Sequence, residues 1–389
     1  MGHTLEEIDM KIIVAPNAFK GSLTAFEAAD AIERGVRRFY KQARIVKKPL
    51  ADGGDGTMEV LARATGGSVL SAAVTGPLGA KAKARYALLG GGETAVIEMA
   101  EASGLRLVKR DERNPMAATT FGTGELIIRA IEKGCNKIIL GIGGSATNEG
   151  GSGMLLALGF RLVNKKGSLI GYGGNGLLEL ARVENPELCG EFKALDIRVA
   201  SDVKNLLLGS SGASRMFGPQ KGATPAMVDK LETALANYAR VIKRDLGVDV
   251  LNLKGGGAAG GIGAGIYAFL GGRMCSGIDV VMDLSRIGKE LKGAALLITG
   301  EGMIDDQSIF GKAPVGVARL AKQHGVPVLC IAGGIGGISR KIYGTGISGI
   351  STLVNAPMEL ESAIRNASTL LADAAERAVR IISIGKRIR

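Results

Sequence analysis

The chain has 389 residues, which predicts two domains because a single hydrophobic core rarely grows that large. Hydrophobic residues make up 46%, yet no apolar run approaches the ~20 residues of a membrane span, so a membrane protein is disfavoured. Lys and Arg exceed Asp and Glu by 49 − 37 = 12, but no helix-turn-helix, RRM or aromatic-interleaved basic stripe accompanies this charge. We therefore expect small anionic ligands as partners, rather than nucleic acid or a membrane.

The cysteines and the N-terminus indicate the compartment. Four cysteines lie far apart in the chain with no CxxC pair, which predicts free thiols in a reducing cytoplasm. Residues 1–9 are polar and acidic and lack the apolar region of a signal peptide, so we expect an N-terminal extension ahead of the first strand. The expected localisation is cytoplasmic, and a monomer or a homodimer fits equally well.

The first elements alternate between strand and helix. An apolar strand is predicted over residues 11–15, and the capping box Thr24-Ala-Phe-Glu27 opens a helix that runs to about Phe39. A second strand over 45–50 leads through a glycine-rich loop to a helix from Met58. This alternation predicts a mostly parallel sheet covered by helices.

The pattern then changes and later returns. Short strand candidates over 69–74, 82–89 and 94–100 have no helix between them, which indicates an inserted domain. From residue 294 a strand (294–298), a loop (299–312) and a helix (313–323) restore the earlier pattern. We therefore expect an α/β fold of two domains. A discontinuous Rossmann-like or flavodoxin-like domain with a mostly parallel sheet spans 10–75 and 285–389, a second α/β domain over 76–284 is inserted in it, and ligands bind in the cleft between them.

Two of the candidate loops lie near the N-terminus. The loop over 17–22 supplies Lys20 and Ser22, which suit a carboxylate or a phosphate. The loop over 51–57, Ala-Asp-Gly-Gly-Asp-Gly-Thr, places Asp52 and Asp55 among glycines. Such a pair suits the orientation of a hydroxyl or a shared Mg²⁺, which prefers one or two carboxylates with phosphate oxygens and water.

The most informative loop covers residues 141–153, Gly-Ile-Gly-Gly-Ser-Ala-Thr-Asn-Glu-Gly-Gly-Ser-Gly, between a strand over 137–140 and a predicted helix over 154–158. Glycines allow close backbone approach, and free N–H groups at a helix start bind anions. Its spacing matches the dinucleotide pattern G-x-G-x-x-A, but Arg161 and Asn164 occupy the region where a ribose-binding acid belongs. NAD is therefore disfavoured, and no Walker A loop is present.

The remaining candidates follow later strands. The loop over 299–312 contributes Glu301, Asp305, Asp306 and Lys312, and Asp202 follows a strand predicted over 197–201. The chain has only two histidines, and His324 is expected to be a helix C-terminal cap. Acids, amides and lysines without histidine fit phosphoryl transfer, which depends on positioning and charge neutralisation.

Five strings in order resemble those of the bacterial glycerate kinases of the glycerate 2-kinase type. They are residues 15–23 (Ala-Pro-Asn-Ala-Phe-Lys-Gly-Ser-Leu), 49–57, 141–153, 217–223 (Phe-Gly-Pro-Gln-Lys-Gly-Ala) and 299–308, with 311–314 continuing the last. The resemblance spans about residues 10–332. It implies a two-domain α/β kinase that transfers the γ-phosphoryl group of ATP to D-glycerate, usually giving 2-phosphoglycerate.

A hypothesis for the site follows. We expect Lys20 and Ser22, with Asp52, Gly53 and Gly54, to bind glycerate, and Lys20 to act in catalysis as well. Asp202, or else Asp55, is the expected base, and Asp52, Asp305 or Asp306 would anchor Mg²⁺. ATP is assigned to Gly143, Gly144, Ser145, Thr147, Asn148, Glu301, Gly302 and Lys312, although the 141–153 loop suits the glycerate carboxylate equally.

Three rival functions remain from the residues alone. An NAD-dependent hydroxy-acid oxidoreductase would need the ribose-binding acid that is missing. A non-catalytic two-domain anion-binding protein would not need so many clustered carboxylates. A nucleic-acid binder, already disfavoured, would show a steep salt dependence of affinity.

Overall fold

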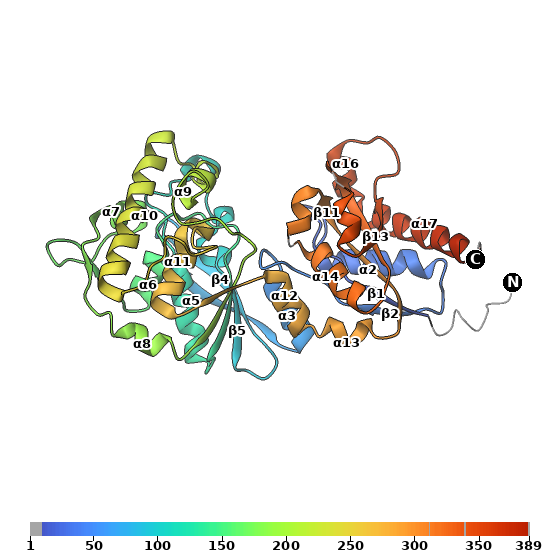
Figure 1. The fold of residues 1–389 in the computed structure, drawn as a ribbon, viewed down its shortest axis with the longest axis horizontal. Coiled ribbons are helices and arrows are strands. Elements are labelled where there is room, and N and C mark those ends of the chain that lie inside the picture. Colours follow the sequence, from blue (N-terminus) through green and yellow to red (C-terminus); the bar gives the residue numbers. More distant parts are fainter. Residues whose placement is uncertain (1–9, 311, 338–339, 388–389) are drawn as a thin grey trace. The chain divides into compact units, whose positions relative to one another are not determined.

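The computed structural model describes residues 10–310, 312–337 and 340–387, so the predicted extension over 1–9 lies outside the described residues. The chain divides into two compact units (Figure 1). Unit 1 comprises Met1–Asp52 and Ile278–Arg389, and unit 2 comprises Gly53–Gly277. The predicted α/β class is confirmed, because each unit is built on a sheet with parallel strands and helices. The predicted interdomain cleft stays a prediction.

Unit 1 contains a five-stranded, fully parallel sheet in the order β13-β12-β11-β1-β2. The strands are β1 (Lys11–Val14), β2 (Arg44–Lys47), β11 (Ala294–Ile304), β12 (Val328–Ile335) and β13 (Ile347–Thr352). Counted along unit 1 this is the order 2-1-3-4-5 of flavodoxin-like folds, whose switch point lies between the first and third strands. Ligand chemistry in unit 1 is therefore expected where β1 and β11 end.

Two long helices cover part of this sheet, α2 (Ala25–Arg37) and α17 (Ala367–Arg387). The predicted capping box starts α2: the Thr24 hydroxyl accepts from the Glu27 N–H at 3.2 Å, and the Glu27 carboxylate accepts from the Thr24 N–H at 2.8 Å. Ile32 of α2 and Leu371 of α17 belong to one buried apolar cluster with strand residues of β1, β11 and β12. The other helices of unit 1 are α12 (Gly277–Leu284), α13 (Ile287–Leu291), α14 (Ala313–Gln323), α15 (Lys341–Gly344) and α16 (Leu360–Arg365).

The segment after residue 298 differs from the prediction of a loop over 299–312. Strand β11 continues to Ile304 and pairs with β12, and a 3-10 turn, η4 (Asp306–Phe310), follows. The glycines here do not end the strand, because they permit close approach: a Cβ on Gly300 would lie 2.1 Å from the Ile331 carbonyl oxygen. Glu301 and Gly302 therefore lie on a strand rather than on a loop.

Unit 2 contains a six-stranded mixed sheet in the order β10-β9-β6-β5-β4-β3. Its strands are β3 (Ser68–Thr75), β4 (Lys81–Leu88), β5 (Thr94–Glu98), β6 (Lys137–Gly141), β9 (Asp196–Ala200) and β10 (Arg273–Cys275). Strands β10, β9, β6 and β5 are parallel, while β4 is antiparallel to both β5 and β3. The three short strands predicted without intervening helices are thus its antiparallel edge.

The helices of unit 2 surround one large apolar core. They are α3 (Thr57–Thr65), α4 (Ala100–Ser103), α5 (Phe121–Glu132), α6 (Ser152–Ala157), α7 (Gly173–Glu179), α8 (Leu188–Phe192), α9 (Ala213–Phe217), α10 (Pro225–Leu246) and α11 (Ala258–Leu270). Strands β7 (Leu162–Val163) and β8 (Arg182–Val183) form a separate pair, and η1 (Leu105–Leu107), η2 (Arg110–Glu112) and η3 (Pro219–Lys221) are 3-10 turns. The start of α11 is not regular helix, because Ala259, Gly260 and Gly261 have φ of 52°, 76° and 92°.

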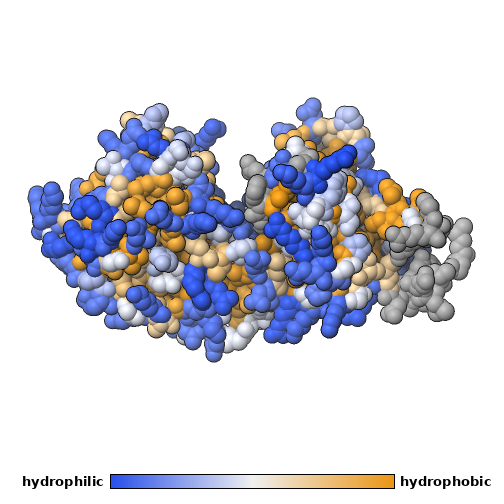
Figure 2. Space-filling view, in the orientation of Figure 1, coloured by the Kyte–Doolittle hydropathy of each residue, from blue (hydrophilic) through white to orange (hydrophobic). Residues whose placement is uncertain are grey.

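The first boundary between the units falls at 52/53, earlier than the expected 75/76. Helix α3 and strand β3 belong to unit 2 because both pack on β4, and α3 also packs on β5. All four cysteines are free, as predicted. In the described part of the chain no helix is both long and apolar enough to cross a membrane. Hydrophilic side chains cover much of the face in view of each unit, with apolar ones between them (Figure 2).

Candidate functional site

In unit 1 the loop after β1 runs beside the carboxyl-terminal half of β11. The Asn17 N–H donates to the Gly300 carbonyl at 2.8 Å, and a Cβ on Gly302 would lie 3.6 Å from the backbone nitrogen of Lys20. Lys20 is exposed at the turn. The Ser22 hydroxyl donates to the Ile364 carbonyl at 3.2 Å, so this predicted ligand residue also ties the loop to α16. Lys20 and Gly302 are thus brought together at the switch point of the sheet.

The end of β11 carries a compact acid–lysine cluster. Lys312 Nζ lies 3.3 Å from Asp305 Oδ1 and 3.9 Å from Glu301 Oε1. The Ser308 hydroxyl bridges the same two carboxylates, at 3.1 Å from Asp305 Oδ1 and 3.4 Å from Glu301 Oε1. Lys312 is the N-cap residue of α14, and the turn η4 places Ser308 between the acids. The structure therefore joins three predicted site residues and adds Ser308, which the sequence reasoning missed.

Burial and neighbouring charges separate the two carboxylates. Burial raises the pKa of Glu301 to about 7; Lys312 opposes that rise, and the charge of Asp52 adds to it. Burial would also raise the pKa of Asp305, but hydrogen bonds from Lys312 and Ser308 outweigh it, so this pKa is lowered. The effect of Asp52 on Glu301 places Asp52, which follows β2, in the same electrostatic cluster. Asp305 is therefore an anion over a wide pH range, while Glu301 titrates near neutrality.

The predicted metal ligands are all in unit 1. Among residues 10–310, 312–337 and 340–387, no three His, Cys, Asp or Glu side chains form a group able to hold a metal ion. Asp52, Asp305 and Asp306 are thus not a preformed three-carboxylate site. An Mg²⁺ ion that arrives with a nucleotide needs only one or two carboxylates, because phosphate oxygens and water complete its shell. The ionised Asp305 fits that donor set.

In unit 2 the candidate residues gather at the carboxyl ends of the parallel strands. Glu98, Gly141 and Ala200 are neighbours in register at the ends of β5, β6 and β9. Gly53 lies against these strand ends. A Cβ added to Gly53 would be 2.7 Å from the Ala200 carbonyl oxygen, and a Cβ added to Gly141 would be 2.6 Å from the Gly53 carbonyl oxygen. Glycine is required at both positions because the backbones approach so closely.

The neighbouring predicted residues lie at the same edge. A Cβ on Gly143 would meet Gly54 Cα at 3.4 Å, so Gly54 lies beside the glycine-rich loop. Asp202 is half-buried two residues after the end of β9. The structure therefore brings the loop after residue 52, the loop after β6 and the Asp202 segment together at one edge of the sheet.

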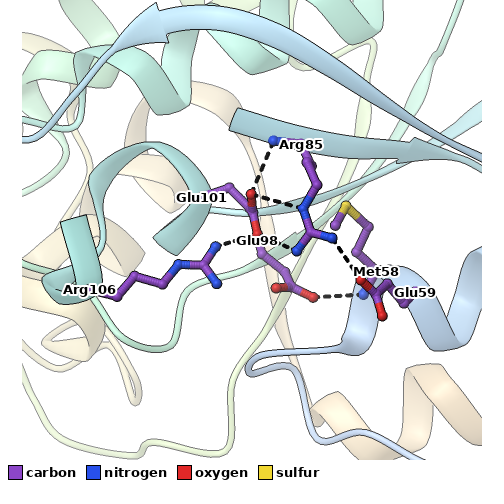
Figure 3. A network of polar contacts seen from close by, with 6 residues as sticks. All are labelled: Met58, Glu59, Arg85, Glu98, Glu101 and Arg106. Atoms are coloured by element: carbon purple, nitrogen blue, oxygen red, sulfur yellow. Dashed lines mark hydrogen bonds and ion pairs between the residues drawn. The ribbon is translucent and has the colours of Figure 1, made fainter. Parts of the chain in front are cut away.

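Glu98 is a residue that the sequence reasoning missed (Figure 3). It is 4% exposed, and its Oε1 accepts from the Met58 N–H at 2.8 Å, in the first turn of α3. Burial raises the pKa of Glu98 to about 7; the Met58 N–H opposes the rise and the charge of Asp55 adds to it. Its signal in the sequence was an acid at the end of an apolar strand. Glu98 thus orients α3 and the loop that carries Asp55.

Beside Glu98 lies an ion-pair network that fixes the same region (Figure 3). Arg85 of β4 pairs with Glu59 of α3 at 2.7 Å and with Glu101 of α4 at 2.9 Å, and Arg106 also pairs with Glu101. Arg85, Glu59 and Glu101 therefore connect strand β4 to helices α3 and α4. Because Glu101 is buried and receives both guanidinium groups, its charge is compensated and the network is structural.

The glycine-rich loop after β6 is divided between exposed and buried residues. Gly143 and Gly144 are exposed, whereas Ser145, Thr147 and Asn148 are 5%, 1% and 0% exposed. The Asn148 amide donates to the Ser214 hydroxyl at 3.0 Å, but Asn148 Oδ1 and Thr147 Oγ1 are buried without partners. The expected anion site therefore has exposed backbone at residues 143–144, followed by the buried polar side chains of Ser145, Thr147 and Asn148.

Two buried charged residues, both missed by the sequence reasoning, hold this loop. Lys221 Nζ donates to the Ser145 hydroxyl at 2.7 Å and to the Thr147 carbonyl at 2.6 Å. Glu149 accepts from the N–H groups of Thr120, Gly173 and Gly153 at 2.6, 2.8 and 3.1 Å. Burial raises the pKa of Glu149, and these donors oppose that rise. Lys221 lies in the quoted string 217–223, which was its signal, although no role was assigned to it.

The comparisons with known proteins agree with one another. Residues 12–383 match the model of the glycerate kinase family. A glycerate 2-kinase from Escherichia coli (strain K12) is 46% identical over 378 residues, covering 97% of this chain and 99% of that protein. A glycerate kinase from Bacillus subtilis (strain 168) is 45% identical over 377 residues, with the same coverage of 97% and 99%.

A solved structure gives the same result. The crystal structure of a candidate glycerate kinase 2 from Salmonella typhimurium LT2 aligns with a TM-score of 0.87 and 46% identity, covering 97% of this chain and 100% of that one. The sequence match and the structural match both extend over nearly the whole chain. The chain therefore belongs to the glycerate kinase family.

Proposed function

We propose that the protein transfers the γ-phosphoryl group of ATP to a hydroxyl of D-glycerate, giving 2-phosphoglycerate and ADP. Membership of a kinase family makes a nucleotide the expected donor. The observation that carries the proposal is the cluster of Glu301, Asp305 and Lys312 at the end of β11, beside the switch point of the unit 1 sheet. At the carboxyl end of a strand, the Lys312 amine can neutralise phosphate charge directly, and the two carboxylates can do so through a bound Mg²⁺.

The proposed reaction assigns a role to each group of residues. Lys20 holds the glycerate carboxylate, supported by Ser22, Asp52, Gly53 and Gly54. An aspartate, Asp202 first and Asp55 second, accepts the proton of the attacking hydroxyl. The hydroxyl oxygen then forms a bond to the γ-phosphorus, and the bond to the β–γ bridging oxygen breaks to leave ADP.

The nucleotide would be bound by two kinds of group. Backbone N–H groups near Gly143 and Gly144 suit phosphate oxygens because both residues are exposed, with Ser145, Thr147 and Asn148 behind them. Glu301, Gly302 and Lys312 are the proposed contacts in unit 1. Asp52, Asp305 and Asp306 would hold Mg²⁺, which supplies positive charge to the β and γ phosphates. The free thiols support a cytoplasmic enzyme with small-molecule partners.

A coupled assay tests the proposal. Purified protein receives ATP, Mg²⁺ and D-glycerate, and ADP is measured, while added enolase converts 2-phosphoglycerate but not 3-phosphoglycerate. We expect glycerate-dependent ADP release and an enolase-dependent product. No ADP release with glycerate would refute the proposed reaction, and a product that enolase leaves untouched would refute the position of the new phosphate.

The base is tested by a matched pair of variants. Asp202→Asn removes the proposed proton acceptor, and Asp229→Asn alters an exposed aspartate on α10 in the same unit. General-base removal lowers kcat by about 10²–10⁴-fold. We expect that loss for Asp202→Asn and not for Asp229→Asn. A near-normal kcat for Asp202→Asn would refute Asp202 as the base, and Asp55→Asn would then test Asp55.

A further inference from the structure

Lys221 is a buried lysine that the proposed reaction has not used. It closes the turn η3, within the string 217–223, and is 2% exposed. In the described part of the chain it makes no ion pair; its partners are the neutral Ser145 hydroxyl and Thr147 carbonyl. A buried charge without an opposite charge is costly. Burial accordingly lowers the pKa of Lys221 to about 7.

The hydrogen-bond pattern next to Lys221 leaves donors unused. In its charged form the Lys221 amine only donates, so the Ser145 oxygen is then the acceptor and its own O–H hydrogen must point to another acceptor. Among the described residues, the one side-chain hydrogen bond of Ser145 is the one that it accepts from Lys221. Thr147 Oγ1 is 1% exposed and has no partner. A free hydroxyl hydrogen on Ser145 beside the Lys221 amine, with an unpartnered hydroxyl two residues further on, forms a setting that an oxyanion would complete.

The charged groups around Lys221 do not neutralise it. Arg113, a second cation, packs on the same turn and donates to the Gln220 carbonyl at 3.3 Å. On α9, Arg215 pairs with Asp229 at 3.3 Å. In the loop, Glu149 is occupied by its own backbone donors. When Lys221 is protonated, its positive charge is therefore left for a ligand.

We propose that Lys221 is the positioning residue that makes the 143–148 loop an oxyanion site, by turning the Ser145 O–H toward the anion and placing positive charge beside it. The oxyanion is either a phosphoryl group of the nucleotide or the carboxylate of glycerate. This inference rests on the proposed function, because it assumes that these two ligands are the substrates. A purely structural lysine would tie residues 217–223 to the loop but would not respond to a bound anion.

Calorimetric binding to the full-length protein tests this role. Wild type, Lys221→Met and the control Lys230→Met, an exposed lysine on α10, are titrated separately with ATP·Mg²⁺ and with D-glycerate. Measurements at about pH 8.5, where phosphate and carboxylate groups are fully ionised, use buffers of different ionisation enthalpy to count protons taken up from solvent. We expect Lys221→Met to weaken one ligand at least tenfold, and that ligand identifies the oxyanion.

Proton uptake separates the proposal from a structural role. Wild type and Lys230→Met should take up part of a proton when that ligand binds, because the anion favours the charged amine, and Lys221→Met should take up none. Equal affinities and equal uptake in all three proteins would overturn the proposal, as would a wild type that binds neither ligand. If Lys221→Met does not fold, the absence of proton uptake by wild type alone overturns it. Wild type that binds both ligands without turnover would instead refute the proposed function.

Discussion

Glu149 provides the sharpest test of how the glycine-rich loop is held. Its carboxylate is fully buried, with Oε1 accepting from the N–H groups of Thr120 and Gly153 and Oε2 accepting from the Gly173 N–H. In Glu149→Gln one oxygen becomes an NH₂ group, which only donates. The least costly orientation puts that group at Oε2, where it faces the single backbone donor of Gly173.

The cost follows from the number of donors left unpaired. One buried N–H without an acceptor costs about 1–3 kcal/mol, so Glu149→Gln should destabilise the protein by that amount. Glu149→Ala leaves three such groups and should cost about 3–9 kcal/mol. The Ser152 hydroxyl, 3.3 Å from Glu149 Oε2, can rotate to accept from the new NH₂ group. Hydroxyl partners of this kind therefore add little to the cost of the glutamine substitution.

Urea unfolding combined with hydrogen exchange measures this effect. The control is Glu179→Gln, which makes the same chemical change at an exposed site on α7 of the same unit. We expect exchange to accelerate most at Gly173, and less at Thr120 and Gly153, in Glu149→Gln, and to stay normal in the control. If Glu149→Gln unfolds at the same urea concentration as Glu179→Gln, with equal protection of the three amides, the buried carboxylate does not hold the loop.

Three further outcomes are expected. The pKa of Glu98 in the folded protein is about 7, above its usual 4.5, so its contribution to the free energy of unfolding is complete below about pH 4.5 and is lost as pH rises through 7. That contribution is about 3 kcal/mol. Glu98→Gln should remove this pH dependence, as measured by urea unfolding at pH 5 and pH 8. Lys312→Met removes the cation 3.3 Å from Asp305 and should lower kcat/KM for glycerate phosphorylation by about 10²-fold, while the exposed Lys292→Met should not; equal rates would remove Lys312 from the reaction. Gly141→Ala puts a Cβ 2.6 Å from the Gly53 oxygen and should cost about 1–3 kcal/mol. The control Gly190→Ala, inside α8, meets nothing within 4 Å and should not lower the unfolding midpoint.

Local patterns in the sequence were enough to predict much of the fold. The helix expected over 313–323 is α14 (Ala313–Gln323), and His324 is its C-cap as predicted. These elements depend on signals a few residues apart, such as the Thr24–Glu27 capping box. Predictions failed where a distant backbone decides. Thr299–Ile304 continues a strand because β12 lies alongside it.

The buried charges could not be predicted for the same reason. Lys221 meets Ser145 across 76 positions of sequence, and Glu98 meets Met58 across 40. No periodicity or spacing rule relates residues so far apart, so only packing reveals that these side chains are enclosed. The sequence did mark Lys221 indirectly, because it stands inside one of the five family-like strings.

The glycines after β6 show what such a string hides. Read alone, each glycine suggests an approach to phosphate, yet Gly141 is needed for the Gly53 backbone, and a Cβ on Gly150 would lie 2.3 Å from the Tyr238 ring. Gly143 and Gly144 are exposed instead, so their N–H groups are the ones a ligand can reach. One stretch thus serves packing at its ends and presents backbone at 143–144. Because Lys221 and Glu149 fix the buried part, the geometry of the exposed part depends on side chains that no substrate needs to touch.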